Sequence, residues 1–169
     1  VPPKMVGSGY KVLVGAHTAD HSNKGTHKRL DRVTRSFKIL DTVTHVANPL
    51  GGGVYIEVPY LADLGLVSLQ VSGVIEAPMF SLKQFDETSE VEWQWRRELD
   101  APWADFETDK FMMQVPSSWI YAKTFPRSVM IDWDTAMDGV SELMGYPPDL
   151  RNRKVLYLQV DVLIRHGAY

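Results

Sequence analysis

The chain is organised around residues 48–58, which read Asn48-Pro49-Leu50-Gly51-Gly52-Gly53-Val54-Tyr55-Ile56-Glu57-Val58. Glycine loses more backbone freedom on folding than any other residue, so three in a row indicate positive φ or a close approach by another group. The Asn-Pro pair predicts a turn, and the β-branched and aromatic residues after the glycines predict a strand. A phosphate-binding loop or a dinucleotide fingerprint would need a helix after the glycines. The segment therefore indicates a tight turn into a buried strand, with a backbone shelf beside a ligand cleft as the alternative.

The composition is that of a soluble globular protein. At 169 residues, 44% hydrophobic and 23% charged, the chain is expected to form a single β-rich domain over residues 1–169. No apolar run approaches the roughly 20 residues of a membrane helix, so no membrane span is expected. The absence of cysteine excludes disulfides and thiolate metal sites from this chain.

The net charge of −3 conceals an asymmetry along the chain. Residues 1–40 hold eight Lys and Arg against two Asp, a net of +6, and the remainder holds ten against nineteen acids, a net of −9. A basic segment can indicate nucleic-acid binding. Here the basic residues are spread through a polar loop and an alternating strand without an aromatic platform, so we expect a solvated face and no nucleic acid.

The first half predicts strands and no helix. Strands are expected over residues 10–15, 32–39, 42–47, 54–58, 66–72 and 75–80. The cleanest alternation is at 66–72, where Val67, Leu69 and Val71 share one face. Short strands separated by turns favour an antiparallel β-sandwich or jelly-roll-like front half.

Two helices are predicted in the second half. Ser89 and Glu92 fit a capping box at the start of a helix over residues 90–99, with Trp95 on its apolar side. An acidic turn is expected after Trp103, then strands at 111–115 and 155–164. The longer helix, 127–144, carries an apolar stripe that is predicted to lie in the core: Val129, Met130, Trp133, Ala136, Met137, Val140, Leu143 and Met144. The predicted fold class is α+β.

The residues alone assign no catalytic or metal-ligating group. His17 and His21 stand four apart, a spacing that can share a metal on a helix, but Ser22, Asn23 and Gly25 predict a loop there. Neither a Gly-x-Ser-x-Gly elbow nor a Cys-His pair is present.

Four motifs in order resemble the enhancin-like family of zinc metallopeptidases. They are residues 10–18 (Tyr-Lys-Val-Leu-Val-Gly-Ala-His-Thr), 48–56 (Asn-Pro-Leu-Gly-Gly-Gly-Val-Tyr-Ile), 77–80 (Ala-Pro-Met-Phe) and 101–107 (Ala-Pro-Trp-Ala-Asp-Phe-Glu). These gluzincin modules are used by bacteria and insect viruses against mucins and other O-glycosylated proteins. The resemblance spans about residues 10–165.

The resemblance implies a location outside the cell or on its surface and an O-glycosylated protein or glycan as partner. The family's His-Glu-x-Gly-His zinc signature is absent from this sequence. The chain is therefore expected to be an inactive N-terminal portion that packs against a missing C-terminal catalytic half, with zinc only in the full-length protein. The resemblance implies that Asn48, Gly51, Gly52 and Gly53 lie near one wall of the cleft.

Two other functions remain open from the sequence. The chain could be a stand-alone glycan-binding β-sandwich, with Trp93 and Trp119 as the ligand-facing candidates because Trp95 is expected in the core. It could also be a structural or interaction domain.

Overall fold

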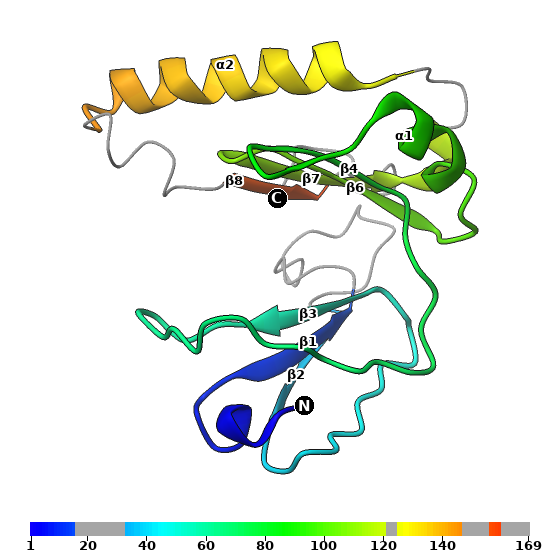
Figure 1. Ribbon diagram of the computed structural model, residues 1–169, viewed down its shortest axis with the longest axis vertical. Helices are drawn as coiled ribbons and strands as arrows, with labels where there is room; N and C mark the ends of the chain where they lie inside the picture. The colour runs from blue at the N-terminus through cyan, green and yellow to red at the C-terminus, as the bar shows by residue number, and fades with distance from the viewer. Residues whose placement is uncertain (16–32, 121–124, 147–155, 160–169) are drawn as a thin grey trace, which may run out of the picture. The chain divides into compact units, whose positions relative to one another are not determined.

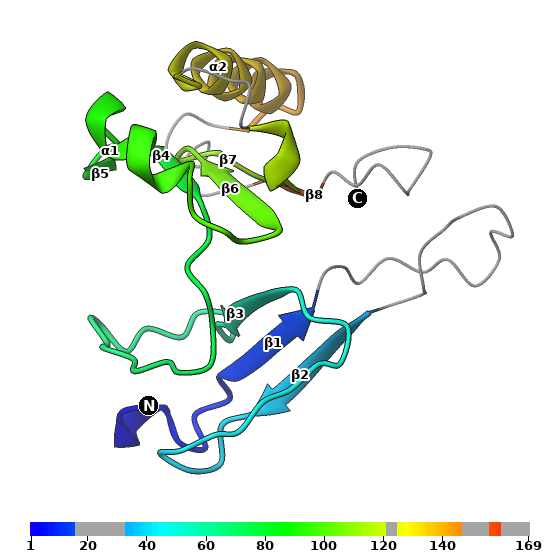
Figure 2. The same cartoon turned by 90° about the vertical axis from the view of Figure 1, so that its right-hand side faces the viewer.

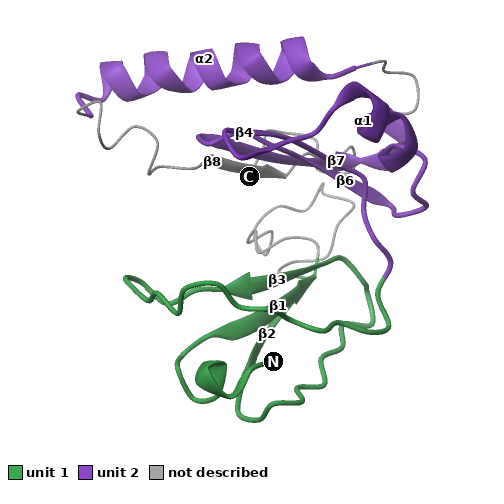
Figure 3. Ribbon diagram, in the orientation of Figure 1, with its two compact units in different colours: residues 1–74 green, residues 75–169 purple. Residues whose placement is uncertain are grey.

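The computed structural model describes residues 1–15, 33–120, 125–146 and 156–159. Contacts divide the chain into two compact units, Val1–Val74 and Ile75–Tyr169 (Figure 3). Each unit is described by itself, and the single domain stays a prediction.

Unit 1 is built on a three-stranded antiparallel sheet with the order β2-β1-β3. Its strands are β1 (Lys11–Gly15), β2 (Thr34–Lys38) and β3 (Gly53–Glu57), and a short 3-10 helix, η1 (Pro3–Met5), precedes them (Figure 1). The predicted strands at 10–15, 32–39 and 54–58 are thus confirmed. The sheet carries a small core of Met5, Tyr10, Val12, Val14 and Ile39.

Two predicted strands of unit 1 are wrong. Neither 42–47 nor 66–72 forms a strand in the structure. The alternation in the second segment holds only over residues 67–70, because Val67 and Leu69 pack on the core and Ser68 and Gln70 are exposed, but Val71 is exposed as well. Burial of the side chains therefore alternates here, although among the described residues no neighbouring strand pairs with the segment to form a β-ladder.

Unit 2 contains a five-stranded mixed sheet with the order β5-β4-β6-β7-β8. The pairs β4–β6 and β7–β8 are parallel, and the others are antiparallel. Its elements are β4 (Met79–Lys83), β5 (Asp86–Glu87), α1 (Glu90–Arg96), β6 (Trp103–Glu107), β7 (Phe111–Pro116), the 3-10 helix η2 (Ser117–Trp119), α2 (Arg127–Leu143) and β8 (Leu156–Gln159).

Both helices of unit 2 lie on the same face of its sheet (Figures 1 and 2). Each belongs to a crossover between parallel strands, α1 from β4 to β6 and α2 from β7 to β8. Parallel neighbours require such a crossover, because a short hairpin cannot join them. The core beneath the helices consists of Phe80, Trp93, Ala104, Phe106, Phe111, Val115, Ile120 and Met130.

The predicted α+β class is confirmed, since the described residues form one antiparallel sheet, one mixed sheet and two α-helices. The sandwich or jelly-roll arrangement stays a prediction. The acidic turn after Trp103 is wrong: Ala104 and Phe106 face the core, and this alternation makes the segment strand β6. No helix among the described residues is long and apolar enough to cross a membrane.

The helix ends follow the expected capping chemistry. The Ser89 hydroxyl accepts a hydrogen bond from the Glu92 amide at 3.1 Å, as an N-cap does. Helix α1 then ends earlier than predicted, at Arg96. Helix α2 ends one residue before the predicted 144, and Gly145 follows with φ of +72°.

Candidate functional surfaces

The glycine turn of unit 1 is shaped by two different constraints. Gly51 and Gly52 have φ of +67° and +109°, so the expectation of positive φ is confirmed for both. Gly53 instead starts β3, where a Cβ would lie 2.5 Å from atoms of the Tyr55 ring. The first two glycines thus meet a requirement of backbone conformation, whereas a side chain at the third would require the Tyr55 ring to move.

Asn48 fastens this turn to the sheet. Its side-chain amide donates to the carbonyl oxygens of Val14 at 3.0 Å and Val33 at 2.8 Å. Its Oδ1 accepts from the Leu50 amide at 3.0 Å. One side chain therefore joins the end of β1, the residue before β2 and the turn into β3. That geometry gives Asn48 a structural task, and its predicted place beside a cleft stays a prediction.

The tryptophans of α1 are placed opposite to expectation. Trp93 is fully buried, with its ring 5.6 Å from Phe80 and 5.5 Å from Phe106 between centroids. Trp95, predicted to lie in the core, is 51% exposed and stacks with the guanidinium of Arg96. The two-residue offset puts the indoles on different sides of a short helix. Trp93 is therefore no surface platform for a sugar, whereas Trp119 in η2 is 43% exposed.

The sheet face opposite the helices carries a polar cluster that the sequence analysis missed. Asp105 and Glu107 alternate with the core residues of β6, so the period-two pattern was the available signal. Gln114 Nε2 donates to Asp105 Oδ1 at 3.1 Å, and Lys83 Nζ lies 2.6 Å from Glu107 Oε2. Burial, reinforced by the Glu107 charge, raises the pKa of Asp105 to about 6 although the Gln114 hydrogen bond opposes the shift. This carboxyl can exchange a proton near neutral pH.

The described residues offer no ligand set for zinc. No group of three or more histidine or acidic side chains able to hold a metal occurs among them. His45 is described, whereas His17, His21, His27 and His166 lie outside the described ranges. A catalytic zinc needs three protein ligands and an open position.

Helix α2 presents a polar contact to the sheet and an apolar side to solvent. Lys110, at the turn between β6 and β7, bonds Asp134 and Asp138, each at 2.8 Å. The predicted core position of the apolar stripe is wrong for most of its members. Met130 is buried and Met137 partly buried, but the following are exposed: Val129, Trp133, Ala136, Val140, Leu143 and Met144.

A second apolar surface protrudes from unit 1. Tyr60, Leu61 and Leu66 are each more than 85% exposed. The turn is ordered by an Ala62 amide to Pro59 carbonyl bond of 3.0 Å, and Leu61 takes a φ of +61°. A non-glycine residue in that region is strained, which marks the loop as a candidate interaction surface.

Comparison with protein families assigns one family model to each unit. Residues 1–72 match the N-terminal domain of M60-like peptidases, and residues 73–169 match peptidase M60, enhancin and enhancin-like. The boundary between the two matches lies within two residues of the boundary between the two compact units.

Curated relatives are much longer than this chain. It is 30% identical to a TRPM8 channel-associated factor homolog of Danio rerio over the whole chain and 18% of that protein. It is 31% identical to the Xenopus laevis homolog, over 99% of this chain and 19% of the relative. With TRPM8 channel-associated factor 2 of Homo sapiens the identity is 30% over 96% of the chain and 18% of the relative. No solved structure matches the chain.

Proposed function

The chain belongs to the family of M60, enhancin and enhancin-like peptidases, and on that premise we propose that it is the non-catalytic N-terminal portion of a zinc metallopeptidase. The observation that carries the proposal is the family match across residues 73–169, more than half of the chain. The sequence of this chain contains no His-Glu-x-Gly-His signature, and the proposal therefore places the catalytic work in another part of the protein. In this proposal the two sheets are scaffold, and no chemical step is assigned to them.

The proposed substrate is a mucin-type O-glycosylated protein, which implies an extracellular or cell-surface location. The support is the family membership, and Trp95 and Trp119 are the two most exposed tryptophans of the described residues, which a sugar ring can stack against. The proposed zinc belongs to the full-length protein, where it would activate a water molecule for peptide-bond hydrolysis.

A second candidate function is protein binding without catalysis. It is favoured by the names of the relatives, which are TRPM8 channel-associated factors, and by the exposed Tyr60, Leu61 and Leu66 loop. Exposed apolar residues on an ordered loop are typical of protein interaction sites. Binding of the chain to the purified channel, with Leu61→Ser/Leu66→Ser as the weakened variant, tests this alternative.

Mucin digestion tests the leading proposal. The full-length protein is expected to release fragments from mucin. A chelator should abolish this release and added zinc should restore it. Enzymatically deglycosylated mucin should resist cleavage. The 169-residue chain should release none. Cleavage by the 169-residue chain, or failure of the zinc-loaded full-length protein to cleave mucin, would overturn the proposal.

A further inference from the structure

Residues 66–74, at the end of unit 1, have the sequence of a strand but no strand neighbour. Their alternation predicts a strand, and residues 67–72 contain no helix, turn or bend. Among the described residues, no backbone–backbone hydrogen bond involves residues 67–74. An extended segment with unpaired amides and carbonyls is a template for pairing with another strand.

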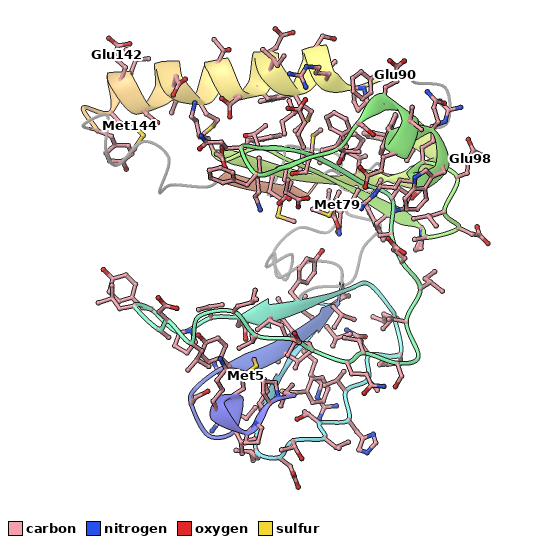
Figure 4. All side chains as sticks on the ribbon, in the orientation of Figure 1. Met5, Met79, Glu90, Glu98, Glu142 and Met144 are labelled. Atoms are coloured by element: carbon pink, nitrogen blue, oxygen red, sulfur yellow. The ribbon has the colours of Figure 1, made fainter. Side chains whose placement is uncertain are left out.

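One side of this segment is anchored to unit 1. Val67 and Leu69 pack on the buried core that contains Met5, which is labelled in Figure 4. Further along the segment, Val71 and Val74 are 57% and 52% exposed. The packed side chains hold the segment in place, so little further ordering of its backbone is needed when a second strand pairs with it.

The segment lacks the features that protect the sheet edges of this molecule. In unit 1, the edge strand β2 carries Arg35 and Lys38 and the edge strand β3 carries Glu57. In unit 2, the edge strand β5 consists of the two acidic residues Asp86–Glu87. Charge, proline and short length are common means by which proteins prevent pairing between sheet edges. Residues 66–74 contain neither a charged residue nor a proline, so their backbone stays open to a partner strand.

The sequence of the segment is complementary to a second copy of itself. Antiparallel pairing about Gln70 places Leu69 of one copy opposite Val71 of the other. The same register places Ser68 opposite Ser72. Apolar residues then meet on one face and serines on the other, and no like charges are brought together. An unrelated strand would have to match this alternation, whereas a second copy matches it by two-fold symmetry.

We propose that two copies of the protein associate through residues 66–74, which pair as an antiparallel ladder centred on Gln70. A two-fold axis relates the copies, so each contributes the same residues to the contact. A ladder of this length is smaller than a standard interface of about 800 Å² per partner, and a dissociation constant on the order of 10–100 µM is therefore expected. This association goes beyond the proposed peptidase function and needs neither zinc nor substrate.

A charge at Gln70 tests the proposal, because the pairing places this residue opposite its own copy. Gln70→Lys in the full-length protein should raise the dissociation constant at least about tenfold, measured by sedimentation equilibrium, since two lysines then face each other. Gln84→Lys, at another exposed glutamine, is the matched control and should change the constant less than about twofold. Gln70→Glu should weaken association as Gln70→Lys does. An equimolar mixture of the Gln70→Lys and Gln70→Glu proteins should restore it, because opposite charges then pair.

Amide hydrogen exchange in residues 66–74 identifies the partner strand. Exchange should slow as the concentration of the full-length protein rises through the dissociation constant. Slow exchange at every concentration would overturn the proposal, because it would assign the pairing to another strand of the same molecule. A protein that stays monomeric up to about 1 mM, or equal dissociation constants for the Gln70→Lys and Gln84→Lys variants, would also overturn it. None of these measurements depends on cleavage, so the proposal fails independently of the peptidase function.

Discussion

The two units stabilise their sheets by different means. Unit 2 buries four large aromatic residues, Phe80, Trp93, Phe106 and Phe111, between its sheet and two crossover helices. Unit 1 has no α-helix among its described residues, and Tyr10 is the single aromatic residue in its buried cluster. Polar side chains fasten its segments instead: Asn48 joins three of them, and Lys4 Nζ donates to the Leu64 carbonyl at 2.7 Å. Substitutions that create cavities should therefore destabilise unit 2 most. Substitutions that remove side-chain hydrogen bonds should destabilise unit 1 most.

The largest effect is expected from Trp93→Ala. Removing a fully buried indole from an aromatic cluster should lower the free energy of unfolding of unit 2 by roughly 3–5 kcal/mol. Trp95→Ala, on the exposed side of α1, is the matched control and should cost less than about 1 kcal/mol. Hydrogen exchange in β6 and β1 separates the units, and equal losses of protection in both strands would contradict the comparison.

Asn48→Ala should be the most damaging single polar change in unit 1. It removes three hydrogen bonds and leaves the carbonyls of Val14 and Val33 without this donor, at a cost of about 2–3 kcal/mol. Asn48→Asp keeps an acceptor for Leu50 but supplies no amide donor, so it should not rescue stability. Urea unfolding of both variants checks this, and full stability of Asn48→Asp would refute the fastening role.

The polar face of unit 2 predicts a pH effect. Asp105 has a pKa of about 6 in the folded protein, above the usual 3.8 of an aspartate, so the folded state binds the proton more tightly than the unfolded state does. Its contribution to stability is complete below pH 4 and is lost as the pH rises through 6. Asp105→Asn, which retains an oxygen for Gln114, should therefore gain about 1–2 kcal/mol at pH 7 relative to pH 4, reduced from the full shift by partial solvation.

The exposed Asp109→Asn is the control for that pH measurement. Melting curves at pH 4 and pH 7 should show the gain for Asp105→Asn and none for Asp109→Asn. A gain that is the same at both pH values would show that protonation of Asp105 is not the cause.

The smallest effect concerns the apolar loop of unit 1. Leu61→Gly should stabilise the unit by about 0.5–1 kcal/mol, because glycine adopts the φ of +61° without steric strain. Leu66→Gly, at an exposed position outside the positive-φ region, should bring no gain. Thermal unfolding compares the two variants, and a loss of stability in Leu61→Gly would show that the strain is absent.

Local sequence patterns predicted the positions of helices and strands better than they predicted which side chains of those elements are buried. The C-terminal end of helix α2 was predicted to within one residue, because Gly145 and the prolines that follow it terminate a helix. The predicted core position of its apolar residues was wrong. An apolar stripe indicates that one side of a helix is covered, but it does not identify the neighbour that covers it. For the same reason Trp93 and Trp95 were interchanged.

The candidate surfaces were less predictable than the fold. Asp105 and Glu107 appeared as an acidic turn because their alternation with Ala104 and Phe106 spans only a few residues. The strain at Leu61 has no sequence signal, since leucine is not a residue that favours positive φ. The positive φ of Gly51 and Gly52 was predictable, because residue type and backbone conformation are directly linked there.

The zinc content of the dialysed protein tests the central claim, that this chain is the scaffold portion of a peptidase whose metal site lies elsewhere. Native mass spectrometry of the 169-residue chain and of the full-length protein measures it directly. We predict no retained zinc in the 169-residue chain and one zinc ion per molecule of the full-length protein. One tightly held zinc ion per 169-residue chain would contradict the account.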